Sequence, residues 1–296
     1  MSRAVGLTDL LTALPDAVVV AFAILTQLGD FWFVFSVCAL AYWLGPYTPR
    51  VGAGITRERA AMVVALLVTA IALTVSLKAA FGLPRPVGAG IAPESALVPA
   101  GLRGVYQSMA TGDGYGFPSG HATVATLVWG GLAWAVRVGT RTQRVAVAGS
   151  VIGVVALSRL VLGVHFAVDV LAGALVAGAV LWVAVSQLRT PVRVFALAAA
   201  VALGGLAVAG LTRDIGAALG MSVTGTAVSA AAPTPPTPTR RGALLTAGLG
   251  VLTVGVMAAV ALLLVADAVA VTGLAAVGTA LLLVLPLVGE RVAKKA

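Results

Sequence analysis

Runs of about twenty apolar residues recur along the whole chain, and no other feature constrains the fold as much. An α-helix needs a run of this length to cross the hydrocarbon core of a membrane. Hydrophobic residues make up 60% of the 296 residues and charged residues 10%, whereas a soluble domain carries roughly 25% charged residues. One soluble core of this length could not bury so much apolar surface. We therefore expect an all-α fold, a polytopic integral membrane helical bundle.

About nine segments are expected to span the membrane. A polar stretch rich in Gly and Pro, Leu83–Pro118, separates the second segment from the third. A further apolar run, Leu10–Leu28, is either a tenth span or a helix lying at the membrane interface, and Pro15 and Asp16 favour the interfacial helix. The expected spans are Asp30–Gly45, Ala60–Gly82, Ser119–Val138, Val145–Gly163, His165–Leu188, Val194–Leu211, Ile215–Ala231, Ala243–Ala266 and Ala268–Val288.

The net charge of +9 is distributed as in a membrane protein and not as in a nucleic-acid-binding protein. The Lys and Arg residues cluster in short segments between apolar runs, which is typical of cytoplasmic loops. If Asp30–Gly45 runs from outside to inside and Ile215–Ala231 spans, most of these cations lie inside. We therefore expect a multi-pass protein of the cell membrane whose partner is the bilayer, with no nucleic-acid partner.

Three short segments bring ionisable residues to the ends of these spans. The chain has two histidines, and both begin an apolar span on the expected outer face. Ionisable residues at such positions are functional candidates by default. The segments are Lys78-AAFGLP-Arg85-Pro86, Pro118-Ser119-Gly120-His121 and Ser158-Arg159-LVLGV-His165-FAV-Asp169.

The chemistry of these segments suits a phosphate group. Lys78, Arg85 and Arg159 can surround a phosphate, and the arginines can donate paired hydrogen bonds to it. Ser119 and Gly120 open a helix, where backbone N–H groups and the helix dipole favour an anion. Taken singly, these residues could also anchor, start or pack helices.

The second histidine has a carboxylate at helical spacing. His165 and Asp169 are four residues apart and share one face of a helix. A carboxylate in this position fixes the imidazole tautomer and stabilises the imidazolium. Asp169 lies four residues into an apolar run, where a purely structural carboxylate is costly. His121 has no carboxylate at that spacing.

Together the three segments resemble the type 2 phosphatidic acid phosphatase superfamily. The chain matches every position of the pattern K-x6-R-P, P-S-G-H and S-R-x5-H-x3-D. That superfamily includes membrane lipid phosphate phosphatases, bacterial polyprenyl diphosphate phosphatases and soluble vanadium haloperoxidases. The resemblance covers roughly Leu10–Leu188 and leaves out the last hundred residues.

The resemblance implies a role for each residue of the pattern. His165 is the implied nucleophile that forms a phosphohistidine, and Asp169 orients it. His121 is the implied general acid and later the base that activates water. The resemblance implies no cofactor and no metal, because cations stabilise the transition-state charge. The implied donors to the phosphate oxygens are Lys78, Arg85, Ser119, Gly120 and Arg159.

A membrane phosphatase acting on a lipid phosphomonoester or a polyprenyl diphosphate at the outer face is therefore the leading hypothesis. The sequence does not choose among phosphatidic acid, phosphatidylglycerol phosphate and polyprenyl diphosphates, and it indicates no particular oligomeric state. A lipid phosphotransferase would use the same nucleophile, so it stays open as an alternative. A non-catalytic transporter or scaffold is the other alternative, and the intact pattern disfavours it. A haloperoxidase is disfavoured because those relatives are soluble.

Four parts are expected along the chain. Residues 1–190 form the catalytic membrane domain, and residues 191–231 form two further membrane helices. Residues 232–242 form a Pro/Thr-rich linker of extended type. Residues 243–296 form a C-terminal helical hairpin, to which the sequence assigns no role. The single cysteine, Cys38, excludes an intrachain disulfide.

Overall fold

The computed structural model describes residues 14–48, 54–93, 95–231, 238–264 and 267–295. Within these ranges the regular structure is helical, with eleven α-helices and no strand, which confirms the all-α prediction. The α-helices are α2 (Asp16–Leu25), α3 (Phe31–Leu44), α4 (Arg57–Phe81), α5 (Arg103–Ala110), α6 (Gly120–Ala135), α7 (Arg141–Val161), α8 (Ala167–Val183), α9 (Pro191–Ala209), α10 (Arg213–Ala231), α11 (Arg240–Leu264) and α12 (Ala268–Lys295). Short turns of other helix types are η1 (Thr26–Gly29), η2 (Ser95–Leu97), η3 (Ala100–Leu102) and η4 (Ala184–Leu188).

Each expected span is helical over most of the part that the structure describes, but the number of spans is not confirmed. Six helices of the described ranges are long and apolar enough to cross a membrane, and a seventh is added if the bent pair Asp16–Gly29 and Phe31–Leu44 is one span. Helix α6 has 16 residues, so it is roughly 24 Å long and shorter than a hydrocarbon core of about 30 Å. Helix α10 is rich in Gly, Ala, Ser and Thr, which lowers its hydropathy. Several long apolar helices nevertheless fit a multi-pass membrane protein.

The ambiguous N-terminal run forms a bent pair of helices. Helices α2 and α3 meet at 43° across η1 and Asp30, as in a broken span or a re-entrant segment. Asp30 begins α3 by accepting a hydrogen bond from the Trp32 backbone N–H at 3.4 Å. Residues 10–13 of the expected run lie outside the described ranges.

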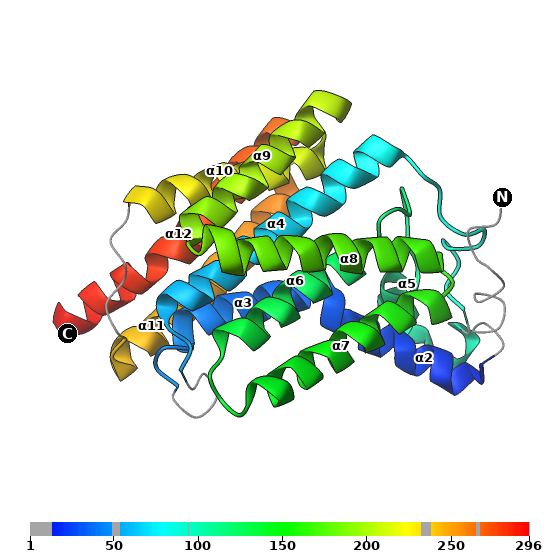
Figure 1. Ribbon diagram of the computed structural model, residues 1–296, viewed down its shortest axis with the longest axis horizontal. Coiled ribbons are helices and arrows are strands. Elements are labelled where there is room, and N and C mark those ends of the chain that lie inside the picture. Colours follow the sequence, from blue (N-terminus) through cyan, green and yellow to red (C-terminus); the bar gives the residue numbers. More distant parts are fainter. Residues whose placement is uncertain (1–13, 49–53, 94, 232–237, 265–266, 296) are drawn as a thin grey trace.

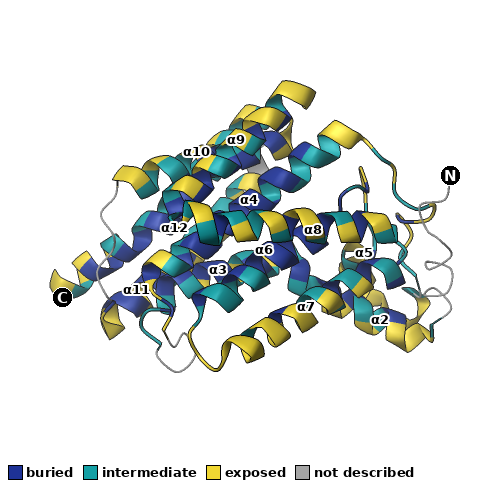
Figure 2. Cartoon of the chain, viewed as in Figure 1, coloured by how far each residue is buried: buried dark blue, intermediate teal, exposed yellow. Residues whose placement is uncertain are grey.

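Helix α4 is the centre of the bundle. It packs against α9, α6, α10 and α3, and most of its length is buried (Figure 2). In Figure 1, α9 and α10 lie on one side of α4, and α6 and α7 lie on the other. Gly82 ends the helix in the left-handed conformation, with φ of 58°, a geometry that glycine adopts at little cost.

The two ends of α4 differ in chemistry. At its N-terminal end, Arg59 donates to the carbonyl of Ala135 at 3.2 Å, and Arg144 donates from Nε to the carbonyl of Ala133 at 3.0 Å. Lys78 lies at the opposite end, in the last turn. The polar stretch rich in Gly and Pro, Leu83–Pro118, lies at this second end and includes the short helix α5.

The C-terminal helices are held to the rest of the bundle by specific hydrogen bonds. Pro286 lies inside α12, and its missing N–H leaves the carbonyl of Leu282, four residues before it, without a helical donor. Trp43 donates from Nε1 to the Leu282 carbonyl at 3.0 Å, and Tyr42 donates from its hydroxyl to the Leu283 carbonyl at 3.1 Å. Within an apolar environment such carbonyls must be satisfied. The sequence of α3 therefore complements the proline of α12.

Candidate active site

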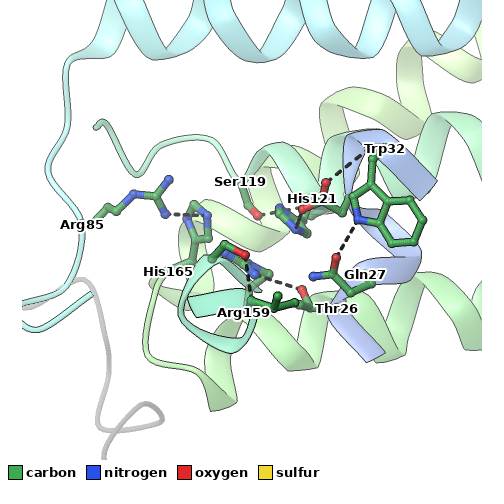
Figure 3. A network of polar contacts seen from close by, with 12 residues as sticks. Thr26, Gln27, Trp32, Arg85, Ser119, His121, Arg159 and His165 are labelled. Atoms are coloured by element: carbon green, nitrogen blue, oxygen red, sulfur yellow. Dashed lines mark hydrogen bonds and ion pairs between the residues drawn. The ribbon is translucent and has the colours of Figure 1, made fainter. Parts of the chain in front are cut away.

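The three sequence segments meet at one end of the bundle, each at a helix terminus. Lys78 lies in the last turn of α4, Ser119 is the N-cap of α6, and Arg159 lies in the last turn of α7. His165 lies in the turn between α7 and α8, and Asp169 lies in the first turn of α8. Figure 3 shows Arg85 pointing toward His165 from one side, with His121 on the other. All eight predicted residues thus come from the same end of the molecule.

His165 is held between a carboxylate and a guanidinium. Its Nδ1 lies 3.5 Å from Oδ2 of Asp169, and its Nε2 lies 3.0 Å from Nη1 of Arg85. Because a guanidinium can only donate, Nε2 must be the acceptor in this contact. The ring proton therefore lies on Nδ1 and faces Asp169. This tautomer leaves the lone pair of Nε2 directed at the cationic side of the site.

The environment of His165 favours its neutral form. The side chain is 2% exposed, and it lies in the turn that joins two spans. Burial lowers the pKa of His165; Asp169 opposes this shift, and the positive charges of Arg159, Arg85 and Lys78 add to it. A neutral imidazole keeps one unprotonated ring nitrogen, which a nucleophile requires.

Asp169 joins the second and third segments. Its Oδ2 accepts from the backbone N–H of Phe166 at 3.0 Å, and its carbonyl accepts from the backbone N–H of Ser119 at 2.9 Å. The Ser119 N–H is therefore engaged within the protein, contrary to its expected role as an anion donor. The Ser119 hydroxyl accepts from the Ala122 N–H at 3.5 Å, so its own proton is still available for an anion.

Gly120 is required by close packing at the site. A Cβ at this position would lie 2.9 Å from Cγ2 of Thr74 on α4. Its absence allows the N-terminus of α6 to approach α4 at the level of the turn before Lys78. The backbone of α6 thereby reaches the cationic end of α4.

Arg159 is the most deeply buried cation of the site. It is 3% exposed, and its Nη1 donates to the hydroxyl of Thr26 at 3.0 Å. Its Nε is buried and finds no acceptor among the described residues. A buried guanidinium with an unsatisfied donor is a ready site for an anion.

Lys78 and Arg85 complete the cationic side. Arg85 donates from Nε to the Asp113 carbonyl at 2.7 Å and from Nη1 to the Val164 carbonyl at 2.9 Å, which fixes the guanidinium beside His165. Burial lowers the pKa of Arg85, but an arginine in a protein stays protonated. The charge of Lys78 acts on both histidines. Three cations thus face the same small region.

A further carboxylate contacts the first histidine. Oδ2 of Asp30 lies 3.5 Å from Nε2 of His121. Sequence reasoning treated Asp30 only as the start of a span. A carboxylate at the edge of an apolar run was the signal that could have identified it.

The turn η1 is a fourth segment of the site. Thr26 is fully buried and binds Arg159, and Gln27 accepts from the indole N–H of Trp32 at 2.8 Å. Trp129 of α6 donates from Nε1 to the Leu28 carbonyl at 2.8 Å, which fixes the turn against the bundle. No spacing rule links η1 to the other segments, so the sequence did not indicate it.

Comparison with known families identifies the part of the chain that carries the site. Residues 59–193 match the family model described as the PAP2 superfamily. No curated protein and no solved structure matches the chain. The matched range includes the three segments with both histidines, and it leaves out Asp30, η1 and α10–α12. Through residues 59–193, a little under half of its length, the chain is similar to the PAP2 superfamily.

Proposed function

We propose that this protein is an integral membrane phosphatase that hydrolyses a lipid phosphomonoester or a polyprenyl diphosphate through a phosphohistidine. The observation that carries this proposal is the placement of His165. Its Nδ1 proton faces Asp169, and its Nε2 lone pair faces the guanidinium of Arg85. The match of residues 59–193 to the PAP2 superfamily model supports phosphatase activity.

In the first step, Nε2 of His165 attacks phosphorus. The N–P bond forms while the bond from phosphorus to the leaving oxygen breaks. His121 donates its proton to that oxygen, so a neutral alcohol leaves from a monoester. Asp169 stabilises the positive charge that develops on the His165 ring.

In the second step, water hydrolyses the phosphohistidine. His121 is now neutral and accepts a proton from the attacking water. The O–P bond forms, the N–P bond breaks, and the pair of electrons returns to Nε2 of His165. The products are inorganic phosphate and the regenerated site.

The cations stabilise the charge on the three equatorial oxygens of each transition state. Arg159, Arg85 and Lys78 surround His165, and the Ser119 hydroxyl and Gly120 backbone supply neutral donors. Within the described residues, no three His, Cys, Asp or Glu side chains are grouped so that they could hold a metal ion. The proposed mechanism therefore assigns the electrostatic role to the side chains alone.

We propose that the site faces the outside of the cell membrane. The cations in the first turns of α4 and α7 lie at the end of α4 opposite Lys78, and helix ends with this charge face the cytoplasm. A lipid headgroup would then reach the site from the outer leaflet while its tail stays in the bilayer.

The test is phosphate release by the purified full-length protein from a panel of lipid phosphates, with and without EDTA. We expect release of inorganic phosphate without an acceptor, and no loss of rate in EDTA. Phosphate transfer that needs an added alcohol or lipid would establish the phosphotransferase alternative. If the protein neither releases phosphate from any substrate nor transfers it to an acceptor, the non-catalytic alternative is favoured. A rate lost in EDTA and restored by Mg²⁺ would overturn the metal-independent mechanism.

A further inference from the structure

An apolar cavity of about 510 Å³ lies among α3, α4, α10, α11 and α12. This volume is within the range of small-molecule sites, roughly 300–1,000 Å³. Its lining is almost entirely hydrocarbon. Among its hydroxyl side chains, Ser36 donates to the Trp32 carbonyl at 2.7 Å and Thr279 donates to the Ala275 carbonyl at 2.9 Å. These hydroxyls are therefore engaged with their own helices and offer little to a polar ligand.

The cavity is long in the direction of the helices. Its lining extends from Phe31 to Trp43 along α3 and from Val271 to Leu285 along α12. At 1.5 Å per residue, these segments measure roughly 18–21 Å. One leaflet contributes about half of a hydrocarbon core of about 30 Å. The cavity is thus long enough for the hydrocarbon chain of a lipid in one leaflet.

Helix α3 leads from the cavity to the candidate active site. Trp32 lines the cavity, and its indole binds Gln27 of η1 at 2.8 Å. Its backbone N–H binds Asp30, and Asp30 contacts His121. Figure 3 shows Trp32, Gln27 and His121 close together. The end of the cavity lining at Trp32 is therefore adjacent to the proposed general acid.

Helix α4 also connects the cavity to the candidate active site. Ile71 lines the cavity, Thr74 packs at Gly120, and Lys78 belongs to the cationic side of the site. Residues three and four apart share a helix face, so 71, 74 and 78 form one continuous strip. A ligand with a phosphate at Lys78 would extend its tail along this strip into the cavity.

We propose that this cavity holds the hydrocarbon tail of the lipid whose phosphate is cleaved, so that α10–α12 select the substrate by its chain. The proposal rests on the proposed function above and extends it to residues that lie outside the family match. A helix from a protein partner does not fit, because the deep lining residues Cys38, Trp43 and Leu282 are buried between helices. A single flexible chain does fit.

The first test fills the cavity and compares substrates that differ only in tail length. Ala275→Trp on α12 and Ala217→Trp on α10 place a ring in the cavity. Val277→Trp and Val223→Trp are matched controls, because these valines are exposed on the same helices and do not line the cavity. The substrates are dioleoyl and dihexanoyl phosphatidic acid, assayed with full-length protein in detergent.

We expect each filling variant to lose about tenfold or more in kcat/KM for the dioleoyl substrate, the scale of discrimination in an apolar pocket. The dihexanoyl substrate should be hydrolysed at nearly the wild-type rate, which also shows that the variants fold. The control variants should match the wild type with both substrates. If the wild type hydrolyses both substrates and Ala275→Trp is indistinguishable from it, the tail does not occupy the cavity. If the wild type releases phosphate from neither of these substrates and from no other lipid phosphate or polyprenyl diphosphate of the panel, the proposed function has failed instead.

A second test needs no substitution that fills the cavity. In a His165→Ala chain whose other tryptophans (Trp32, Trp129, Trp134 and Trp182) are phenylalanine, Trp43 reports from the deep end. Phosphatidic acid brominated near the end of its acyl chains should quench Trp43 in vesicles, and brominated phosphatidylcholine at the same mole fraction should not. Equal quenching by both lipids would show that any bilayer lipid enters the cavity, and this would overturn the proposal. The absence of quenching by either lipid would also overturn it. If the filling variants are inactive with every substrate, the quenching of Trp43 decides whether the lipid tail occupies the cavity.

Discussion

At the scale of single residues, the two histidines are distinguished by their partners. His165 has Asp169 at Nδ1 and Arg85 at Nε2, so we predict that it alone carries the phosphate. Rapid quenching with labelled substrate should trap an acid-labile adduct in the wild type and none in His165→Ala. His121→Ala should keep the adduct when the leaving group is good, because such a group needs no proton. An adduct that persists in His165→Ala, or that maps to Ser119, would identify another nucleophile.

The charges around His165 predict the acidic side of the pH profile. Burial and the nearby cations lower the pKa of His165, so the ring stays neutral as the pH falls through the usual value of about 6.5. The acidic limb of kcat/KM should therefore lie below pH 6.5. Removing one cation with Arg85→Gln should lower kcat/KM and also move this limb to higher pH. A limb at the same pH in Arg85→Gln would show that the guanidinium does not act on the nucleophile.

Asp30 is a positioning residue for His121 and gives the third prediction. The carboxylate lies 3.5 Å from the imidazole and stabilises its protonated form. Asp30→Asn should lower kcat by roughly 10²-fold, the lower end for general acid catalysis, and move the alkaline limb of its pH profile to lower pH. Substrates with a good leaving group should be less affected. A uniform loss for all leaving groups, with an unchanged profile, would indicate a structural role only.

At the scale of helices, the sequence predicted the elements better than their meeting points. Apolar runs and end signals such as Gly82 place the helices, because these are local properties of the chain. The pairing of Asp30 with His121 joins residues 91 positions apart along different helices, and no periodicity encodes such a contact. The same holds for Thr26 with Arg159. The site residues of the three segments were predictable because their spacing places them at helix ends. The contribution of η1 to the site could be recognised only from the three-dimensional structure.

The hydrogen bond between α3 and α12 gives a prediction about stability. Trp43→Phe removes the donor to the Leu282 carbonyl, and an unsatisfied buried carbonyl costs about 1–3 kcal/mol. Pro286→Ala restores a backbone N–H to this turn of α12. We predict that Trp43→Phe lowers Tm in the wild type and lowers it much less in Pro286→Ala, a coupling that a double-mutant cycle measures. Equal losses in both backgrounds would show that the indole does not compensate for the proline.

At the scale of the whole molecule, the cations at the end of the bundle away from the site predict its orientation. Arg59 and Arg144 lie at the end of the bundle opposite Lys78, and the first end should face the cytoplasm. In a background with Cys38 replaced, Ala96→Cys should react with impermeant reagents on intact cells. Ala96 is exposed in the stretch beside the site, whereas a side chain at the neighbouring Gly112 would meet Arg85.

The matched control for orientation is Thr142→Cys, which is exposed at the first turn of α7 on the opposite end. It should react only after the cells are permeabilised, because the membrane separates the two ends of the bundle. Both variants should retain phosphatase activity, since neither residue belongs to the site. Labelling of Thr142→Cys on intact cells, with Ala96→Cys protected, would place the site on the cytoplasmic face. The substrate would then have to come from the inner leaflet, while the contacts that surround His165 and His121 would be unchanged.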